Sequence, residues 1–156
     1  MTASVNDTTA HTQILQRQHW MRVLAVAGPH LSAYGDELRQ GEHQFIRPAE
    51  IGMVMVRGRT GGSGAAFNLG EMTVTRCVVQ LEGGPRGHGY VAGRGKSHAE
   101  LAALADAHLQ GECQDYWLAH LIEPLEGIQR AARNEQEARS AATAVNFVTM
   151  MRGENE

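Results

Sequence analysis

The sequence predicts an α+β domain in which an antiparallel β-meander of about four strands is flanked by N-terminal and C-terminal helices. Three observations support this class. Apolar residues recur at helical spacing near both ends of the chain, β-branched residues concentrate in the middle, and glycine-rich turns separate the middle segments. Because these turns are too short for parallel crossovers, the strands are expected to run antiparallel.

The N-terminal part predicts two helices after a polar start. Residues 1–11 indicate a disordered lead-in, and residues 12–156 are expected to form a single domain. Residues 13–27 place apolar side chains near one helical face, and this helix is expected to end at Gly28. A second, shorter helix is expected over residues 31–39.

The middle of the chain has the alternation and the β-branched residues that are typical of strands. Pro48 interrupts the first strand and must lie at a sheet edge or a bulge, because proline cannot donate to the ladder. Glycine-rich turns lie at residues 58–64 and around Gly83. The predicted strand segments are residues 45–47, 51–57, 66–69, 72–81 and 87–92.

Helices are expected again after the sheet. Pro124 is expected to divide the last two, and Glu135 and Arg139 form an i,i+4 ion pair on the final one. The tail at residues 145–153 becomes apolar again and is expected to dock on another surface. The predicted helices are residues 97–109, 113–122 and 125–143.

Composition and charge exclude two classes of protein. The chain has 156 residues, with 14 Lys and Arg against 17 Asp and Glu, for a formal net charge of −3. Nonspecific nucleic-acid binding requires a basic surplus, so no nucleic-acid partner is expected. No apolar run approaches the roughly 18 residues of a membrane span, and the polar start lacks a secretory signal. Cys77 and Cys113 have no C-x-x-C spacing, which indicates free thiols in a cytoplasmic protein.

A basic, glycine-rich loop at residues 91–100 runs into the helix after the sheet. Ser97 and Glu100 have the S-x-x-E spacing of a capping box, in which each side chain binds the other's backbone N–H. Arg94, Lys96 and His98 stand near the positive end of the helix dipole, where anions bind. Two interpretations follow: a site for a phosphate or phosphonate ligand, and a capped helix with solvated basic neighbours.

No catalytic or metal-binding pattern emerges from the other residues. Gly95-Lys96-Ser97 matches the end of a P-loop, but the first glycine of that motif would stand at Tyr90. The eight histidines show neither H-x₃-H nor H-E-x-x-H spacing, so no metal ligand is expected. Arginines near the expected sheet bind phosphates or line interfaces. They are Arg47, Arg57, Arg59, Arg76 and Arg94. The residues indicate an anion-tolerant binding or scaffold domain.

Several segments, in the same order, resemble the PhnG family of the phosphonate C–P lyase system. The segments are RQHWMRVLA at 17–25, IRPAEIG at 46–52, RTGGSG at 59–64, VAGRGKSHAE at 91–100 and VNFVTMMRG at 145–153. The resemblance continues through Phe67, Gly70 and Thr75-Arg76, whereas residues 110–140 match least well.

The resemblance implies a subunit of a bacterial assembly that uses phosphonates as a phosphorus source. In such assemblies the PhnG protein and the H, I and L subunits support the displacement of adenine from ATP by methylphosphonate, with the I subunit as the catalyst. The product is α-D-ribose 1-methylphosphonate 5-triphosphate. The PhnG protein and the H, I and J subunits form a two-fold core complex, and a later radical step on the J subunit uses an iron–sulfur cluster and S-adenosylmethionine. No cofactor and no catalytic residue are expected on this chain itself.

The resemblance leaves two uses open for the basic residues: holding an anionic ligand, and docking on a partner, most directly the I subunit. The candidate residues are Arg59, Arg76, Arg94, Lys96, Ser97 and His98. The apolar tail supplies candidate docking residues, namely Phe147, Val148, Met150, Met151 and Arg152.

Two other functional classes stand beside this one. A free-standing phosphoryl-transfer or hydrolytic enzyme would use Arg94, Lys96 and His98, and an interaction domain would be unrelated to phosphonates. The missing catalytic set and the broken P-loop argue against the enzyme. The ordered matches along most of the chain argue against the unrelated domain.

Overall fold

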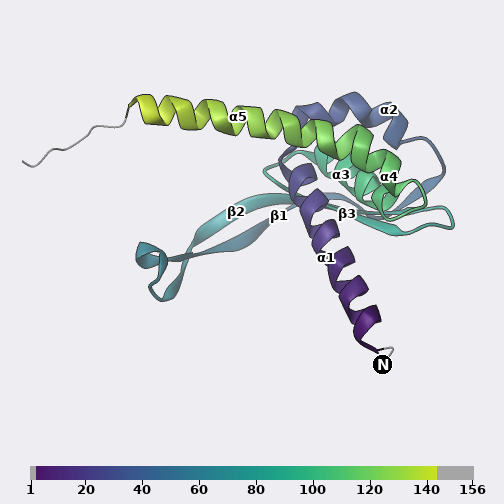
Figure 1. The fold of residues 1–156 in the computed structure, drawn as a ribbon, viewed down its shortest axis with the longest axis horizontal. Helices are drawn as coiled ribbons and strands as arrows, with labels where there is room; N and C mark the ends of the chain where they lie inside the picture. Colours follow the sequence, from purple (N-terminus) through teal and green to yellow (C-terminus); the bar gives the residue numbers. More distant parts are fainter. Residues whose placement is uncertain (1–2, 144–156) are drawn as a thin grey trace, which may run out of the picture.

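The computed structural model describes residues 3–143, with side chains from residue 11 onward, and has the expected α+β architecture (Figure 1). One antiparallel sheet has the strand order β1-β2-β3. There are three strands rather than about four, because the segments expected at 66–69 and 72–81 form one continuous strand. Gly70 lies between them and pairs with Val56 of the neighbouring strand, and the strand continues past a register shift at this point. The strands are β1 (His43–Arg59), β2 (Ala66–Leu81) and β3 (Arg86–Ala92).

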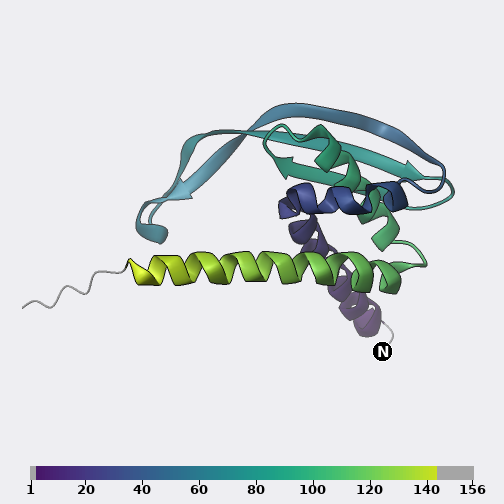
Figure 2. The same cartoon turned by 90° about the horizontal axis from the view of Figure 1, so that it is seen from above.

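The helices lie on one side of the sheet (Figure 2). No helix within residues 3–143 is both long enough and apolar enough to cross a membrane. Before the sheet come α1 (Ala3–Val26), the 3₁₀ helix η1 (Gly28–Tyr34) and α2 (Gly35–Leu38), and the short turn η2 (Thr60–Gly62) joins β1 to β2. After the sheet come α3 (Lys96–Leu109), α4 (Gln114–Trp117), the π-helical turn η3 (Leu118–Ile122) and α5 (Glu123–Ala142).

Two helix predictions need correction. Helix α1 begins at Ala3, so residues 3–11, where the sequence indicates a disordered lead-in, are helical in the structure. Once a helix is nucleated by its packed turns, each further residue adds a hydrogen bond at little cost. Pro124 does not divide two helices, because it lies in the first turn of α5, where its missing N–H breaks no helical hydrogen bond.

Strand β1 forms the edge of the sheet and is irregular near Pro48, as the sequence predicts. Its register against β2 shifts between Arg47 and Glu50, on either side of the proline. At a bulge in an edge strand, no ladder hydrogen bond needs the N–H that proline lacks. Ala49 turns into the core at this point, where it is buried.

Helix α3 packs directly on the backbone of β3. A Cβ atom built on Gly89 would lie 1.9 Å from the carbonyl oxygen of Ala99, and one built on Gly87 would lie 1.9 Å from that of Ala103. The two glycines alternate along the strand and the two alanines are one helical turn apart, so small residues face one another. This close approach fixes where the start of α3 lies relative to the sheet.

The core fills the space between this face of the sheet and the helices. Its members are buried apolar side chains from every helix except η2, together with all three strands, β1 contributing Ala49. The largest include Trp20, Leu24, Leu31, Leu38, Val79, Val91, Leu101, Leu104, Leu109, Trp117, Leu121, Ile122 and Leu125. The predicted apolar face of the first helix is confirmed from Trp20 to Ala27, whereas Ile14 is exposed.

Candidate functional site

The loop before α3 is open, and its capping differs from the prediction. Helix α3 begins at Lys96 with Gly95 as the N-cap, and the Ala99 N–H donates to the Gly95 carbonyl oxygen at 3.0 Å. No side chain caps this helix, so the capping box of Ser97 and Glu100 is wrong. The helix starts two residues earlier than that motif requires, with Gly95 rather than Ser97 as the N-cap, which places Ser97 inside the first turn.

The basic residues of the loop do not act as one group. Arg94, Lys96 and Ser97 are exposed, and among the described residues the Arg94 and Lys96 side chains have no hydrogen-bond or ion-pair partner. The His98 ring lies 2.8 Å from the Leu24 carbonyl oxygen, through Nε2, and joins α3 to the end of α1. The cationic side chains available to a ligand or partner at this loop are therefore those of Arg94 and Lys96.

The structure does not bring the other two arginines to this loop. Arg76 donates to Glu50 Oε1 at 2.7 Å across the β1–β2 ladder, and Arg47 lies 3.5 Å from the same carboxylate oxygen. Arg59 stands at the far end of the β1–β2 hairpin, where it donates to the Gly64 carbonyl oxygen at 3.2 Å (Figure 1). The predicted docking residues of the tail lie outside the described residues; they are Phe147, Val148, Met150, Met151 and Arg152.

Two further histidines, His108 and His19, make contacts that join helices of the fold. His108 Nε2 lies 3.1 Å from the Leu38 carbonyl oxygen, and His19 Nε2 lies 3.1 Å from Glu126 Oε1. Within the part of the chain that the structure describes, no three His, Cys, Asp or Glu side chains gather as a metal site would require. These contacts join α2 to α3 and α1 to α5.

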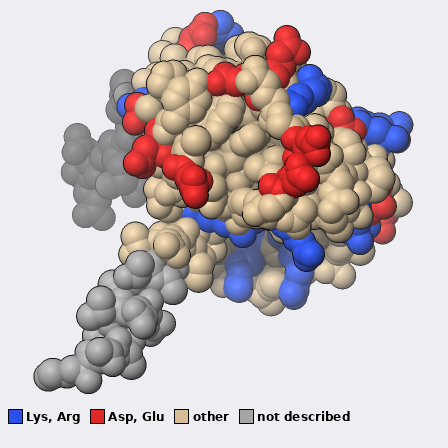
Figure 3. Space-filling view, turned by 90° about the vertical axis from the view of Figure 1, so that its right-hand side faces the viewer, with Lys and Arg blue, Asp and Glu red and all other residues tan. Residues whose placement is uncertain are grey.

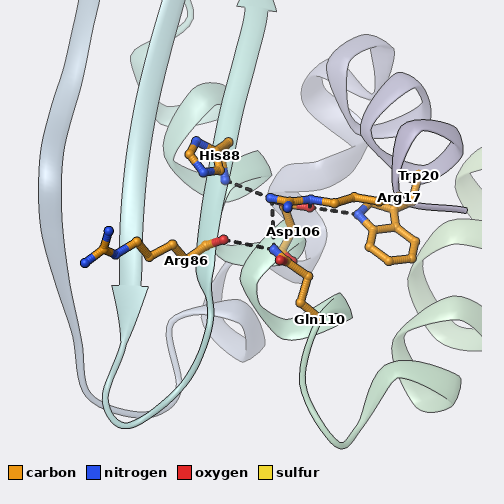
Figure 4. A network of polar contacts seen from close by, with 6 residues as sticks. All are labelled: Arg17, Trp20, Arg86, His88, Asp106 and Gln110. Atoms are coloured by element: carbon orange, nitrogen blue, oxygen red, sulfur yellow. Dashed lines mark hydrogen bonds and ion pairs between the residues drawn. The ribbon is translucent and has the colours of Figure 1, made fainter. Parts of the chain in front are cut away.

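The most connected polar group is the carboxylate of Asp106, which the sequence analysis did not single out (Figure 4). It is fully buried in α3 and accepts hydrogen bonds from Arg17 Nη2 at 2.8 Å, Trp20 Nε1 at 2.8 Å and the His88 backbone N–H at 2.9 Å. Gln110 Nε2 adds a contact at 3.2 Å. A buried charge is tolerated when it is paired and hydrogen-bonded in this way. The network joins α1, β3 and α3.

An open hollow of about 470 Å³ borders this network. Arg17 and Trp20 line it on one side, and the loop after α3 lines it on the other. Four glutamines line the hollow together with Ile14 and Trp20, but the Arg17 guanidinium is already engaged by Asp106. Its full lining is Gln13, Ile14, Gln16, Arg17, Trp20, Gln110, Gly111 and Gln114.

The second feature that the sequence analysis missed is an exposed apolar arm. We define the arm as residues 51–73, the part of the β1–β2 hairpin that extends beyond α3, toward the same side as the C-terminal end of α5 (Figures 1 and 2). Its large apolar side chains are exposed rather than buried. They are Ile51, Met53, Met55, Phe67, Leu69 and Met72. The apolar run at residues 51–56 predicted a strand, but not that its large side chains are exposed.

Comparison with known proteins assigns the family. A family model described as "Phosphonate metabolism protein PhnG" matches residues 15–153. A protein of Rhizobium meliloti (strain 1021), named alpha-D-ribose 1-methylphosphonate 5-triphosphate synthase subunit PhnG, is 39% identical over 150 residues, which cover 95% of this chain and 96% of the relative. The match extends over the helices, the sheet and the arm alike, and the chain therefore belongs to the PhnG family of phosphonate metabolism proteins.

Proposed function

We propose that this chain is a non-catalytic subunit of α-D-ribose 1-methylphosphonate 5-triphosphate synthase, within the core complex of the C–P lyase system. The observation that carries the proposal is the 39% identity, along 95% of the chain, to a relative named as a subunit of that synthase. Its partners in the proposal are the H, I and J subunits, with the L subunit joining transiently. The complex works in the cytoplasm and takes ATP and methylphosphonate as substrates.

Two structural observations support a role without catalysis. The best-connected carboxylate, Asp106, is buried and holds Arg17 and Trp20, so it has no free face toward a substrate. The His98 ring is engaged by the Leu24 carbonyl oxygen and does not converge with Arg94 and Lys96. A free-standing phosphoryl-transfer enzyme would need such groups to meet around one reacting atom.

In this proposal the chain contributes binding surfaces. Arg94 and Lys96 either hold an anionic ligand of the complex or contact acidic residues of the I subunit, since cationic side chains serve both purposes. The cofactors belong elsewhere: the iron–sulfur cluster and S-adenosylmethionine serve the later radical step on the J subunit.

Co-expression tests the assignment. The chain carrying an affinity tag is produced together with untagged H, I and J subunits from the same source, and the purified material is analysed by size-exclusion chromatography. We expect the four chains to elute as one complex. Elution of this chain alone, while the H, I and J subunits assemble without it, would contradict the proposed function.

A further inference from the structure

The outer edge of β1 is open along the arm. Strand β1 lies at the end of the strand order β1-β2-β3, so one of its edges pairs with β2 and the other has no partner strand within residues 3–143. From Glu50 to Val56 the pairing with β2 runs without a register shift. A regular edge strand of this kind presents a row of unpaired backbone N–H and C=O groups to any strand that approaches it.

This open edge is apolar and is bounded at both ends. Residues 51–56 have the sequence IGMVMV, with no charged residue and no proline. Before them, Pro48 and the register shift between Arg47 and Glu50 interrupt the edge, and a further shift follows just before Arg57. Native proteins cover or interrupt uncharged, regular edge strands, because such strands otherwise pair with other chains.

Apolar side chains are exposed on both faces of the arm. Met53 pairs with Thr73, two residues from the buried Thr75, and lies on the face that α3 covers in the body of the sheet. Gly58 lies five positions after Met53 in the same strand and so faces the other side, where the Phe67 ring would lie 3.5 Å from a Cβ built on it. A surface laid on one face would leave the other exposed. A strand added at the edge reaches both, because its own side chains alternate between the two faces.

The absence of charge limits which segment can bind this edge. The end of the molecule that faces away from the arm carries many charged side chains, with Asp and Glu gathered above Lys and Arg (Figure 3). Residues 51–56 have none. A segment that pairs with them must itself be uncharged over about five residues, because an unpaired charge is costly to bury. It must also contain β-branched or aromatic residues, which favour strands.

The tail of this chain has the required composition. Residues 145–151 have the sequence VNFVTMM, which includes no charged residue and places apolar side chains at odd and even positions alike. The odd positions are Val145, Phe147 and Met151, and the even positions are Val148 and Met150. The region that matches the family model extends to residue 153 and so includes this segment. In a strand, these side chains would serve both faces of the arm.

The tail also follows an element that ends on the side of the arm. Helix α5 ends at Ala142, on the side of the molecule toward which the arm extends (Figures 1 and 2). Strand β1 runs toward the tip of the arm, so a chain that leaves α5 and follows β1 back toward the body runs antiparallel to it. Residues 144–153 span roughly 33 Å when extended, which provides a connection followed by a strand of about five residues.

We propose that the tail pairs with the outer edge of β1 in the same chain, as a fourth, antiparallel strand. Its backbone hydrogen-bonds the outward N–H and C=O groups of residues 51–56. Its apolar side chains pack beside Met53 and Met55 on one face, and beside Val54 and Val56 on the other. The arm then has three strands, whereas a hairpin of two strands is marginally stable by itself. The docking residues of the tail thus contact this chain rather than a partner.

Amide hydrogen exchange on the lone, full-length chain tests this pairing. At alternate residues of the segment 51–56 the N–H points away from β2, and NMR follows its exchange in deuterated water. We expect these outward N–H groups to exchange at least about a hundredfold more slowly than in an unstructured peptide, because a hydrogen-bonded N–H must open before it exchanges. Exchange at the rate of the unstructured peptide would overturn the inference, since the edge would then be free.

A matched pair of tail variants provides the second test. Val148→Asp places a charge in the proposed strand, and Asn155→Asp places the same charge beyond residue 153. We expect Val148→Asp to raise the exchange rates of the outward N–H groups at least about tenfold, because the charge opposes burial of the strand. Asn155→Asp is expected to leave them within about twofold of wild type, and the amides of α3 should be unchanged in both variants. Equal outward exchange in Val148→Asp and wild type would overturn the inference.

Other occupants of the edge would give different results. Protection that appears only in a dimer, as measured by sedimentation, would show that a second copy covers the edge and would overturn the inference. Protection that appears only after the H, I and J subunits are added would assign the edge to a partner and would also overturn it. Failure of the chain to assemble with those subunits would overturn the proposed function instead, because the pairing is tested on the lone chain.

Discussion

Trp20 Nε1 donates a 2.8 Å hydrogen bond to Asp106 Oδ1, across 86 positions of the sequence. The same carboxylate accepts from Arg17 of α1 and from the backbone N–H of His88 in β3. The N-terminal helix, the last strand and α3 therefore meet at one buried charge. The position of α1 depends on this carboxylate as well as on the apolar contacts of its buried face.

Removal of this carboxylate is expected to destabilise the whole domain. Asp106→Ala leaves the Arg17 guanidinium partly buried without its counter-ion and the Trp20 N–H without an acceptor. Breaking such a pair costs about 3–5 kcal/mol in the free energy of unfolding. Urea unfolding followed by circular dichroism measures the loss.

A variant in an exposed ion pair of α5 is the control for Asp106→Ala. Glu135 and Arg139 of α5 lie 2.5 Å apart, with side chains 65% and 77% exposed. Glu135→Ala is expected to change the free energy of unfolding by no more than about 0.5 kcal/mol. If Asp106→Ala and Glu135→Ala lower the free energy of unfolding equally, the buried network stabilises the fold no more than an exposed ion pair does.

The contact of α3 with β3 predicts a strong response to one methyl group. In Gly89→Ala the added Cβ would meet the Ala99 carbonyl oxygen at 1.9 Å, so the helix must move away from the strand. We expect a loss of at least about 2 kcal/mol in the free energy of unfolding. Gly70→Ala in β2 is the control, because its Cβ would meet no atom within 4 Å. A Gly89→Ala variant as stable as Gly70→Ala would refute the close packing.

The sequence predicts the elements well where local chemistry decides them. Pro48 at a bulge, the turn at residues 58–64 and the helix after the sheet follow from proline, glycine and apolar spacing. The number of strands did not follow in this way, because Gly70 resembles a break yet pairs with Val56 beside a register shift within one continuous strand. Whether a glycine ends a strand depends on its partner strand, which local sequence does not specify.

The candidate site was less predictable than the fold, because its features depend on distant contacts. Asp106 lies in an apolar helical run and is paired by residues from α1 and β3. The charges of the basic loop predicted that His98 joins Arg94 and Lys96 in one site, but the His98 ring contacts the Leu24 carbonyl oxygen of another helix. The apolar run in β1 predicted a strand, and only the structure shows that Met53 and Met55 of this strand are exposed.

The two cysteines are expected to differ in reactivity. Burial, together with the negative charge of Glu100, raises the pKa of the Cys77 thiol from 9.0 to about 11, so Cys77 stays protonated at pH 8. Cys113 is exposed. Brief treatment of the native chain with iodoacetamide at pH 8 is expected to alkylate Cys113 and to spare Cys77. Mass spectrometry reads both sites, and alkylation of Cys77 at the rate of Cys113 would show that the thiol is accessible.

The raised pKa of Cys77 also predicts how the stability of the fold changes with pH. The unfolded thiol ionises from about pH 9 and the folded thiol from about pH 11, so unfolding releases a proton between these values. Stability is therefore expected to be complete below pH 9 and to fall as the pH rises toward 11. The free energy of unfolding of the variant Cys77→Ala should fall less steeply with pH over the same range. An identical slope for the variant and the wild type would exclude a contribution from this thiol.

The basic loop is expected to affect the complex rather than the fold. Arg94 and Lys96 are exposed, so Arg94→Ala combined with Lys96→Ala should keep the wild-type melting temperature. Loss of a charge-assisted contact costs about 1.5–3 kcal/mol, which is roughly tenfold or more in binding. Assembly or activity of the reconstituted synthase is expected to fall accordingly. Ser97→Ala, which removes no capping bond, is the control. If the double variant matches wild type in every assay, Arg94 and Lys96 contact neither a ligand nor a partner, and the loop is only the start of a helix.

The release of adenine from ATP in the presence of methylphosphonate tests the central claim most directly. The assay compares the purified chain alone, the H, I and L subunits without it, and the reconstituted set, with free adenine quantified by chromatography. We predict no release by the lone chain, little release by the partners alone, and sustained release when this chain is added back. Sustained release by the lone chain, or full activity of the partners in its absence, would contradict a non-catalytic subunit on which the synthase depends.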